Sequence, residues 1–297
     1  LSDMHQKIWQ ILPVSPADTS NSPYSSISTF AGNHLLISLD CLVEKDLIDS
    51  NMLNSFNDKK YRRIIFDDVI KFKLPLLQKI SEDFNERASS DMISRFDEFC
   101  LNESYWLEGY SLYWSLSKQN KYRPWNTWKI KTPHDFYMHE AKVVQFLFHE
   151  QWISLRKYCN SKGIHLLGDM PIYVGYNSAD VYLNQKLFQL DCNGEMKYQS
   201  GCPPCDYQEN GQLWGTPLYN WEAHKTTNFS WWEQRFKKLL DMVDIIRLDH
   251  FIGYSKYYRI PFNQETAHNG EWINAPGDDL FKILKTKIPN LNVIAED

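Results

Sequence analysis

The sequence of 297 residues contains no run of 18 apolar residues, which is about the length that a membrane-crossing helix needs. We therefore expect no transmembrane span and no membrane partner. An excess of basic residues is also lacking, because 32 lysines and arginines stand against 37 acidic residues, and the net charge is -5. Since proteins bind nucleic acids by neutralising phosphates, this balance gives no reason to expect a nucleic-acid partner.

Cysteine is sparse, and the six that occur are scattered through the chain. This distribution favours reduced intracellular thiols, and with them a cytoplasmic location, over a disulfide scaffold. Only Cys202 and Cys205 lie close together, which raises the alternative of a redox or zinc site. A thioredoxin-like pair needs its first cysteine at a helix N-terminus, and zinc needs two further ligands, neither of which the pattern offers. We therefore expect no metal and no cofactor.

Aromatic residues, in contrast, are abundant and make up 15% of the chain, including eleven tryptophans and seventeen tyrosines. Such a load favours binding of flat or ring-shaped ligands, since aromatic faces stack on sugars and on bases. Core packing is the alternative explanation for most of these side chains.

Short apolar runs alternate with helical patterns, as in parallel βα units. Strands are expected within 8–14, 164–174, 244–251 and 292–297, and helices near 135–162, 231–243 and from Pro276 onward. Residues 41–131 have helical spacing throughout, with an interruption expected at Pro75. The fold class is thus α/β, with a barrel portion formed by 1–40 and 132–297 and a helical insertion at 41–131.

Three of the expected strands end in an acid, namely Asp169, Asp249 and Glu296. In a parallel barrel the carboxyl ends of all strands converge on one face, so these acids point into a common pocket. Two close carboxylates are the minimum equipment for cleaving a glycosidic bond. Arg247, two residues before Asp249, is expected to keep Asp249 ionised and nucleophilic. Glu296, backed by an apolar run, is expected to have a raised pKa, as an acid catalyst requires.

Six longer blocks resemble one known family. The chain is similar to the 4-α-glucanotransferases called amylomaltase or disproportionating enzyme, of the α-amylase clan, and the similarity covers nearly its whole length in order. The blocks are WQILPV, SPYSSISTFAGN, GDMPIYVGYNSADVY, GQLWGTPLYNW, IIRLDHFIGY and VIAED.

This resemblance implies a (β/α)8 TIM barrel with helical insertions, of which the chain holds about strands 2 to 5. It also implies a retaining transfer of an α-1,4-glucan segment from a donor maltooligosaccharide to another glucan or to glucose. The nucleophile falls on Asp249 and the acid/base on Glu296. The positions matching the sugar-binding residues of the family are Arg247, His250, Asp169, Ser22, Tyr24, Gln212 and Trp214.

The sequence departs from the family pattern at two places. No counterpart is found for the family's third acid, an Asp in a His-Asp pair on a later strand, so we expect this chain alone to be inactive. Its start at Leu1 and its stop directly after the apolar run 293–295 indicate a piece of a longer protein. In the acceptor loop, Pro203-Pro204 is followed by Cys205 where the family has Asp, and the aromatic Tyr207 is shifted by one position.

Two other functions fit parts of the pattern. An α-glucan hydrolase of the same clan would use the same strand-end acids with water as the acceptor. The long loop carrying GQLWGTPLYNW favours transfer, because it offers a means of excluding water. A non-catalytic glucan-binding protein is the third possibility, suggested by the missing third acid.

Overall fold

The computed structural model describes residues 1–54 and 62–296, and its contacts divide the chain into two compact units. The first unit comprises residues 1–30 and 155–297, and the second comprises residues 31–154. Within the described residues, no helix is long and apolar enough to cross a membrane. The candidate site lies entirely in the first unit.

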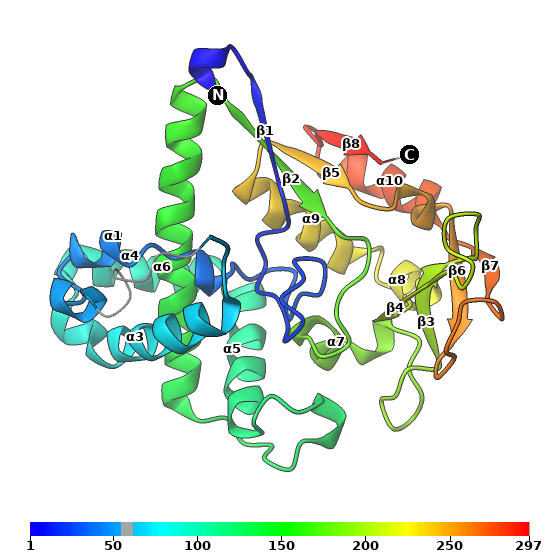
Figure 1. The fold of residues 1–297 in the computed structure, drawn as a ribbon, viewed down its shortest axis with the longest axis horizontal. Helices are drawn as coiled ribbons and strands as arrows, with labels where there is room; N and C mark the ends of the chain where they lie inside the picture. Colours follow the sequence, from blue (N-terminus) through cyan, green and yellow to red (C-terminus); the bar gives the residue numbers. More distant parts are fainter. Residues whose placement is uncertain (55–61, 297) are drawn as a thin grey trace. The chain divides into compact units, whose positions relative to one another are not determined.

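A parallel sheet of four strands forms the centre of the first unit, in the order β1-β2-β5-β8 (Figure 1). Each strand lies within one of the four runs expected from the sequence, and their parallel pairing is confirmed. β2 is a continuous run of buried residues after its first position, as is typical of strands covered on both faces. The strands are β1 Ile8–Ile11, β2 His165–Met170, β5 Ile245–Leu248 and β8 Val293–Ala295.

The first strand is exposed, although its apolar sequence is typical of a buried strand. Ile8 is 46% and Trp9 39% exposed. Within the described residues, β1 pairs only with β2, so it forms an edge of the sheet, and β8 forms the other edge. The apolar sequence of a core strand is thus present on a strand that has only one neighbour.

The helices of the first unit lie between these strands along the chain. α9 contacts β5, and its Trp232 and Phe236 are both fully buried. A valine after α9 explains why β2 contains Gly168, because a Cβ there would lie 2.6 Å from the side chain of Val243. The helices are α7 Ala179–Leu183, α8 Trp221–Thr226, α9 Ser230–Met242 and α10 Gly277–Lys287, with short 3-10 turns η1 Ser2–Met4, η5 Gln185–Leu187 and η6 Phe251–Tyr254.

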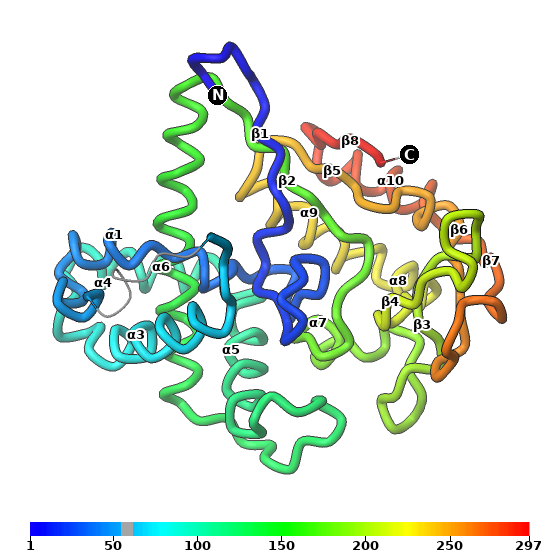
Figure 2. The backbone as a smooth tube through the Cα atoms, in the orientation of Figure 1, coloured from blue at the N-terminus to red at the C-terminus, as the bar shows by residue number. Residues whose placement is uncertain are grey.

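A second sheet is formed by four short strands between residues 198 and 274, none of which is among the strands expected from the sequence. It is antiparallel, in the order β4-β3-β6-β7, and its path can be followed in Figure 2. Glycine inside β3 and β4, and proline at the ends of β4 and β6, mask the strand pattern there. Gly201 is required where β3 meets β4, since a Cβ there would lie 2.0 Å from the carbonyl oxygen of Gln212. The strands are β3 Tyr198–Cys202, β4 Gln212–Pro217, β6 Lys256–Pro261 and β7 Glu271–Asn274.

The second unit is helical. Phe84, Phe96 and Phe146 from three of its helices pack together, with ring centroids 5.2 to 6.1 Å apart. The expected interruption at Pro75 is wrong, because α3 runs through it, and burial of side chains after the proline, such as Phe84, offsets the lost backbone bond. The elements are η2 His34–Leu36, α1 Asp40–Val43, η3 Ser50–Leu53, α3 Phe66–Arg87, α4 Ser90–Asn102, α5 Ser104–Gln119, η4 Trp125–Thr127 and α6 Asp135–Ser161.

The boundary between the units falls inside α6, between Ser154 and Leu155. This helix starts two residues after Pro133 and is followed by Gly163 at φ +71°, the conformation that commonly closes a helix. The expected insertion 41–131 lies within the second unit, and its boundaries stay a prediction.

Candidate active site

The register of the parallel sheet brings three strand-end acids together around one arginine. Asp169 on β2 lies directly opposite Arg247 on β5. Asp249 follows β5 and Glu296 follows β8, and the backbone N–H of each donates to the neighbouring strand. Since side chains two residues apart share a face of a strand, Arg247 and Asp249 point to the same side.

The Arg247 guanidinium contacts all three carboxylates. Its Nη1 donates to Asp169 Oδ1 at 2.7 Å and to Asp249 Oδ1 at 3.1 Å, and its Nη2 donates to Glu296 Oε1. We refer to these four residues as the carboxylate cluster. Burial alone would lower the pKa of Arg247, but the hydrogen bonds and charges of the acids raise it overall. The arginine therefore stays charged and holds both expected catalytic acids on one group.

Three carboxylates around one guanidinium leave the cluster with an excess of negative charge. Burial, followed by the charge of Asp169, raises the pKa of Asp249 to about 6, although Arg247 acts in the opposite direction. Arg247 favours the ionised form of Asp249, as expected, but burial and the like charges outweigh this ion pair in the pKa. Asp249 is ionised at neutral pH and becomes protonated under mildly acidic conditions.

Glu296 is held by two donors, the Arg247 guanidinium and the backbone N–H of His250, which lies 2.6 Å from Oε2. His250 has a left-handed backbone, with φ at 50°, which is uncommon for a residue with a side chain and is found at functional sites. The apolar surroundings expected for Glu296 are not present here, because Ile294 is 45% exposed and the Glu296 side chain 37% exposed. Its position on the edge strand β8 is the reason.

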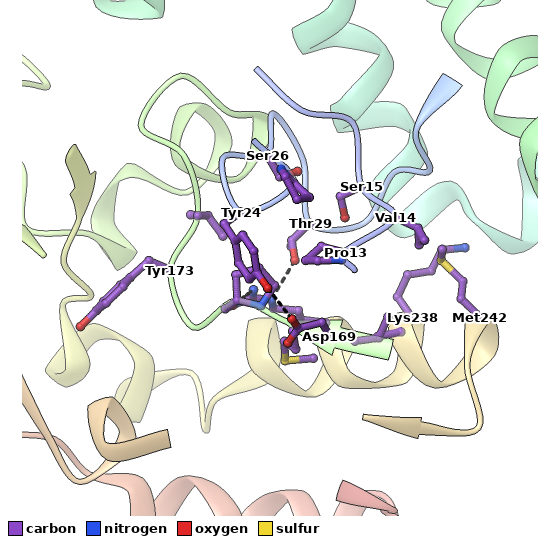
Figure 3. Close-up of a pocket in the computed structure, with 16 residues that line it drawn as sticks. Pro13, Val14, Ser15, Tyr24, Ser26, Thr29, Asp169, Tyr173, Lys238 and Met242 are labelled. Carbon is purple, nitrogen blue, oxygen red and sulfur yellow. Dashed lines mark hydrogen bonds between the residues drawn. The ribbon is translucent and has the colours of Figure 1, made fainter. Parts of the chain in front are cut away.

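Tyr24 lies beside the cluster on the loop after β1. Its hydroxyl donates to Asp169 Oδ2 at 2.8 Å, as Figure 3 shows, and burial is the largest cause that raises its pKa. Ser22 does not contact the cluster directly, but its hydroxyl accepts the backbone N–H of Tyr24 at 3.3 Å. Tyr24 and Asp169 also line a small cavity of about 30 Å³. The loop therefore presents a neutral phenol donor to Asp169.

Trp214 on β4 packs against His250, with ring centroids 4.9 Å apart in an edge-to-face arrangement. Its indole N–H donates to Gln212 Oε1 at 2.7 Å. Burial lowers the pKa of His250, so its imidazole is neutral near pH 7. Trp214 thus lies against His250, whose backbone N–H donates to Glu296 of the cluster, whereas Gln212 and Ser22 are linked to the cluster only through Trp214 and Tyr24.

Two residues near this site were not singled out from the sequence. Tyr173 lies against Trp214, with ring centroids 6.0 Å apart. Arg235 on α9 is almost fully buried and donates to the backbone after Asp169. Helical spacing offered a signal for Arg235, because it lies among Trp231, Trp232 and Phe236 on the apolar face of the helix.

Cys202 ends β3, and Cys205 lies on the loop that follows it. All six cysteines are free thiols, and Cys205 is exposed. No group of three or more His, Cys, Asp or Glu side chains among residues 1–54 and 62–296 is arranged to hold a metal ion. Tyr207, the shifted aromatic, is 96% exposed.

The fold and the site together define an α/β protein with an acidic candidate active site at the carboxyl ends of parallel strands. Comparison with known families is specific. The model of the 4-alpha-glucanotransferase family matches residues 1–297, and the chain therefore belongs to this family.

Individual relatives agree with this assignment. The chain is similar to the 4-alpha-glucanotransferase of Aquifex aeolicus (strain VF5), with 38% identity over 98% of this chain and 61% of that protein. It is also similar to that of Synechocystis sp., with 36% identity over 100% of this chain and 62% of that protein. The chain thus spans 61% to 62% of the length of these relatives.

Solved structures show the same similarity. An amylomaltase from Streptococcus agalactiae in complex with acarbose is similar to this chain, with a TM-score of 0.90 at 30% identity, over 100% of this chain and 62% of that one. An amylomaltase from Corynebacterium glutamicum matches with a TM-score of 0.82 at 20% identity, over 100% of this chain and 43% of that one. The second match shows the fold alone.

Proposed function

We propose that the protein to which this chain belongs is a 4-α-glucanotransferase that moves an α-1,4-glucan segment from a donor maltooligosaccharide to the 4-hydroxyl of another glucan or of glucose. One observation carries the proposal, namely the sharing of the Arg247 guanidinium by Asp249 and Glu296. It supplies two adjacent carboxylates in different surroundings, as retaining chemistry requires. The acarbose bound to the Streptococcus agalactiae amylomaltase supports an oligosaccharide ligand.

In the proposed reaction, an Asp249 oxygen attacks the anomeric carbon of the donor sugar while the bond to the leaving glycosidic oxygen breaks. Glu296 gives its proton to that oxygen, so the shortened glucan leaves as an alcohol and a glycosyl ester remains on Asp249. Glu296, now ionised, takes the proton from the 4-hydroxyl of an acceptor, whose oxygen displaces Asp249. The second step restores both carboxyl groups and completes the transfer with retention.

The remaining cluster residues have binding roles in this proposal. Asp169, with Tyr24 as its donor, offers a carboxylate to sugar hydroxyls, and Arg247 keeps the acids in register. Trp214 presents an aromatic face next to His250. Gln212 and Ser22 support Trp214 and Tyr24, respectively.

We further infer that the four parallel strands are part of a (β/α)8 barrel, as about strands 2 to 5. Apolar residues exposed on both edge strands, Trp9 on β1 and Ile294 on β8, support this inference, because neighbouring strands would cover them. Since the 297 residues hold no counterpart for the family's third acid, we propose that they are inactive alone. The expected cytoplasmic location also remains a proposal, and a relative from rice is named chloroplastic/amyloplastic.

The activity is tested by incubating the full-length protein with maltotriose alone. A transferase holds the acceptor hydroxyl beside Glu296 at a high effective concentration, so we expect glucose together with longer α-1,4-glucans and an almost constant number of reducing ends. Products that are all shorter than the substrate, with reducing ends rising at each turnover, would instead identify the hydrolase. No change in maltotriose would refute both activities.

A further inference from the structure

Arg235 on α9 is a buried cation that belongs to none of the contacts of the carboxylate cluster. It is 2% exposed, and charged side chains are almost never buried to this degree unless they are paired. Its guanidinium lies over the rings of Trp231 and Trp232, at 5.4 and 5.2 Å from their centroids. These rings confine the guanidinium, so its hydrogen bonds have a fixed geometry.

The hydrogen bonds of Arg235 join segments that are far apart in sequence, and Nη1 also donates to the Tyr219 hydroxyl at 3.2 Å. Nε donates to Thr29 Oγ1 at 2.8 Å, on the loop that carries Tyr24. Nη1 donates to the carbonyl oxygen of Ile172 at 3.0 Å, and Nη2 donates to that of Pro171. Both carbonyls lie within three residues of Asp169. One guanidinium therefore links the backbone that carries Asp169 to the loop that carries Tyr24.

Asp180 supplies the opposite charge through Thr29. Its Oδ2 accepts the backbone N–H of Thr29 at 2.9 Å, and it is, like Arg235, 2% exposed. The loop is also fixed next to Asp180, because the backbone N–H of Ala179 donates to the carbonyl of Ile27 at 2.8 Å. Thr29 is therefore held by an anion on its backbone and by a cation on its side chain.

The structure assigns Arg235 as a positioning residue that sets the hydrogen bond between Tyr24 and Asp169, and through it the binding of the donor sugar. Figure 3 shows Tyr24 and Thr29 on the same loop, with the Tyr24 hydroxyl pointing toward Asp169. The role in sugar binding rests on the proposed function, whereas the effect on the Tyr24–Asp169 contact does not. The hydrogen bonds of Arg235 reach Thr29 and the backbone carbonyls of Pro171 and Ile172, so it acts on the carboxylate cluster through these two segments.

Arg156 on α6 offers a matched control. It donates to Asp244 Oδ1 at 2.8 Å, just before β5, and to the carbonyls of Leu240 and Asp241 in the last turn of α9. Asp244 in turn accepts the backbone N–H of Leu166 at 2.8 Å. Both arginines thus link a carboxylate-bound segment to backbone carbonyls, but they do so at opposite ends of the sheet.

The test combines Arg235→Lys with Tyr24→Phe in a double-mutant cycle in the full-length protein. Without any glucan, we expect Tyr24→Phe to lower the melting temperature by a few degrees in the wild type and much less in Arg235→Lys, where the hydrogen bond is already lost. In an Arg156→Lys background the effect of Tyr24→Phe should be undiminished. Equal effects of Tyr24→Phe in the wild type and in Arg235→Lys would overturn the proposal.

Kinetics provide the second readout. In the wild-type background, we expect Arg235→Lys to lower kcat/KM for maltotriose about tenfold. In the Tyr24→Phe background, the same substitution should lower it less than about twofold. Arg156→Lys should have little effect on kcat/KM. Thermal coupling without transferase activity would refute the proposed function but keep the positioning role. If Arg235→Lys does not fold, Thr29→Val removes the same link with a side chain of similar size, and it must show the same coupling.

Discussion

Asp169 and Arg247 lie opposite each other on adjacent parallel strands, and Arg247 Nη1 donates to Asp169 Oδ1 at 2.7 Å. The same nitrogen also donates to Asp249 Oδ1. The pairing of the two strands therefore brings the proposed binding acid and the proposed nucleophile to one nitrogen of Arg247. An arginine is suited to this position because its planar group presents several donors in a fixed arrangement. The register of the sheet therefore determines the geometry of the cluster.

Replacement of Arg247 by lysine is expected to lower kcat/KM for maltotriose by two or more orders of magnitude. A single ammonium group cannot contact Asp169, Asp249 and Glu296 in the geometry that the guanidinium allows. Arg259→Lys is the matched control, because Arg259 pairs with Glu271 on the second sheet, away from the cluster. If the two variants retained similar activity, the organising role of Arg247 would be refuted.

Asp249→Asn is expected to lower the rate of transfer by several orders of magnitude and to stabilise the fold at neutral pH. The pKa of Asp249 is raised to about 6 in the folded protein, so the folded state binds more protons than the unfolded state between about pH 4 and pH 6. The free energy of unfolding therefore falls as the pH rises through this window. The amide side chain of the Asp249→Asn variant does not titrate, so the variant does not lose this stability.

The gain in the free energy of unfolding should be on the order of 1 kcal/mol at pH 7. It is no larger because solvent screens the charge of a side chain that is partly exposed. Urea unfolding at pH 7 and at pH 4 measures it, and the difference between variant and wild type should disappear at the lower pH. A variant that is less stable than the wild type at pH 7 by the same amount as at pH 4 would contradict the raised pKa.

The acid limb of the kcat/KM profile is expected near pH 6. A nucleophile must be ionised, and the pKa of Asp249 is raised to about 6 by burial and by the charge of Asp169. Activity should therefore fall about tenfold for each pH unit below this value. A profile that stays flat down to pH 5 would show that Asp249 ionises more readily than its surroundings imply.

Trp214→Ala is expected to raise KM for maltotriose about tenfold or more, with a smaller effect on kcat. Loss of an aromatic face removes stacking on the sugar and the contact that orients His250. Trp272→Ala on β7 is the control, since Trp272 is an exposed tryptophan of the second sheet that packs on Tyr258. Comparable changes in KM in the two variants would indicate a general effect on folding.

The central sheet and its acids could be predicted from the sequence because they depend on local patterns. An apolar run ending in an acid indicates a strand and its carboxyl end, and parallel pairing then brings Asp169, Asp249 and Glu296 to the same edge. The assignment of binding residues such as Tyr24 and Trp214 came from the resemblance to the family. No periodicity in the sequence would have shown it.

Other features depend on contacts between distant segments, so local patterns do not reveal them. The antiparallel sheet is built from short strands, two of which, β3 and β4, contain glycine. The raised pKa of Asp249 depends on burial and on the charge of Asp169, 80 residues earlier, and the left-handed backbone of His250 follows from its place after β5. The Arg235 network joins residues more than 200 positions apart.

The most direct test of the proposed mechanism is to trap the glycosyl group on the full-length Glu296→Gln variant. The fluoride of an α-maltosyl fluoride donor leaves without an acid catalyst. The second step, in contrast, needs Glu296 as a base, so the glycosyl intermediate should accumulate. Mass spectrometry of peptides from the acid-quenched protein should find the added maltosyl group on Asp249. A label on another residue, or none while fluoride is released and products form, would contradict Asp249 as the nucleophile.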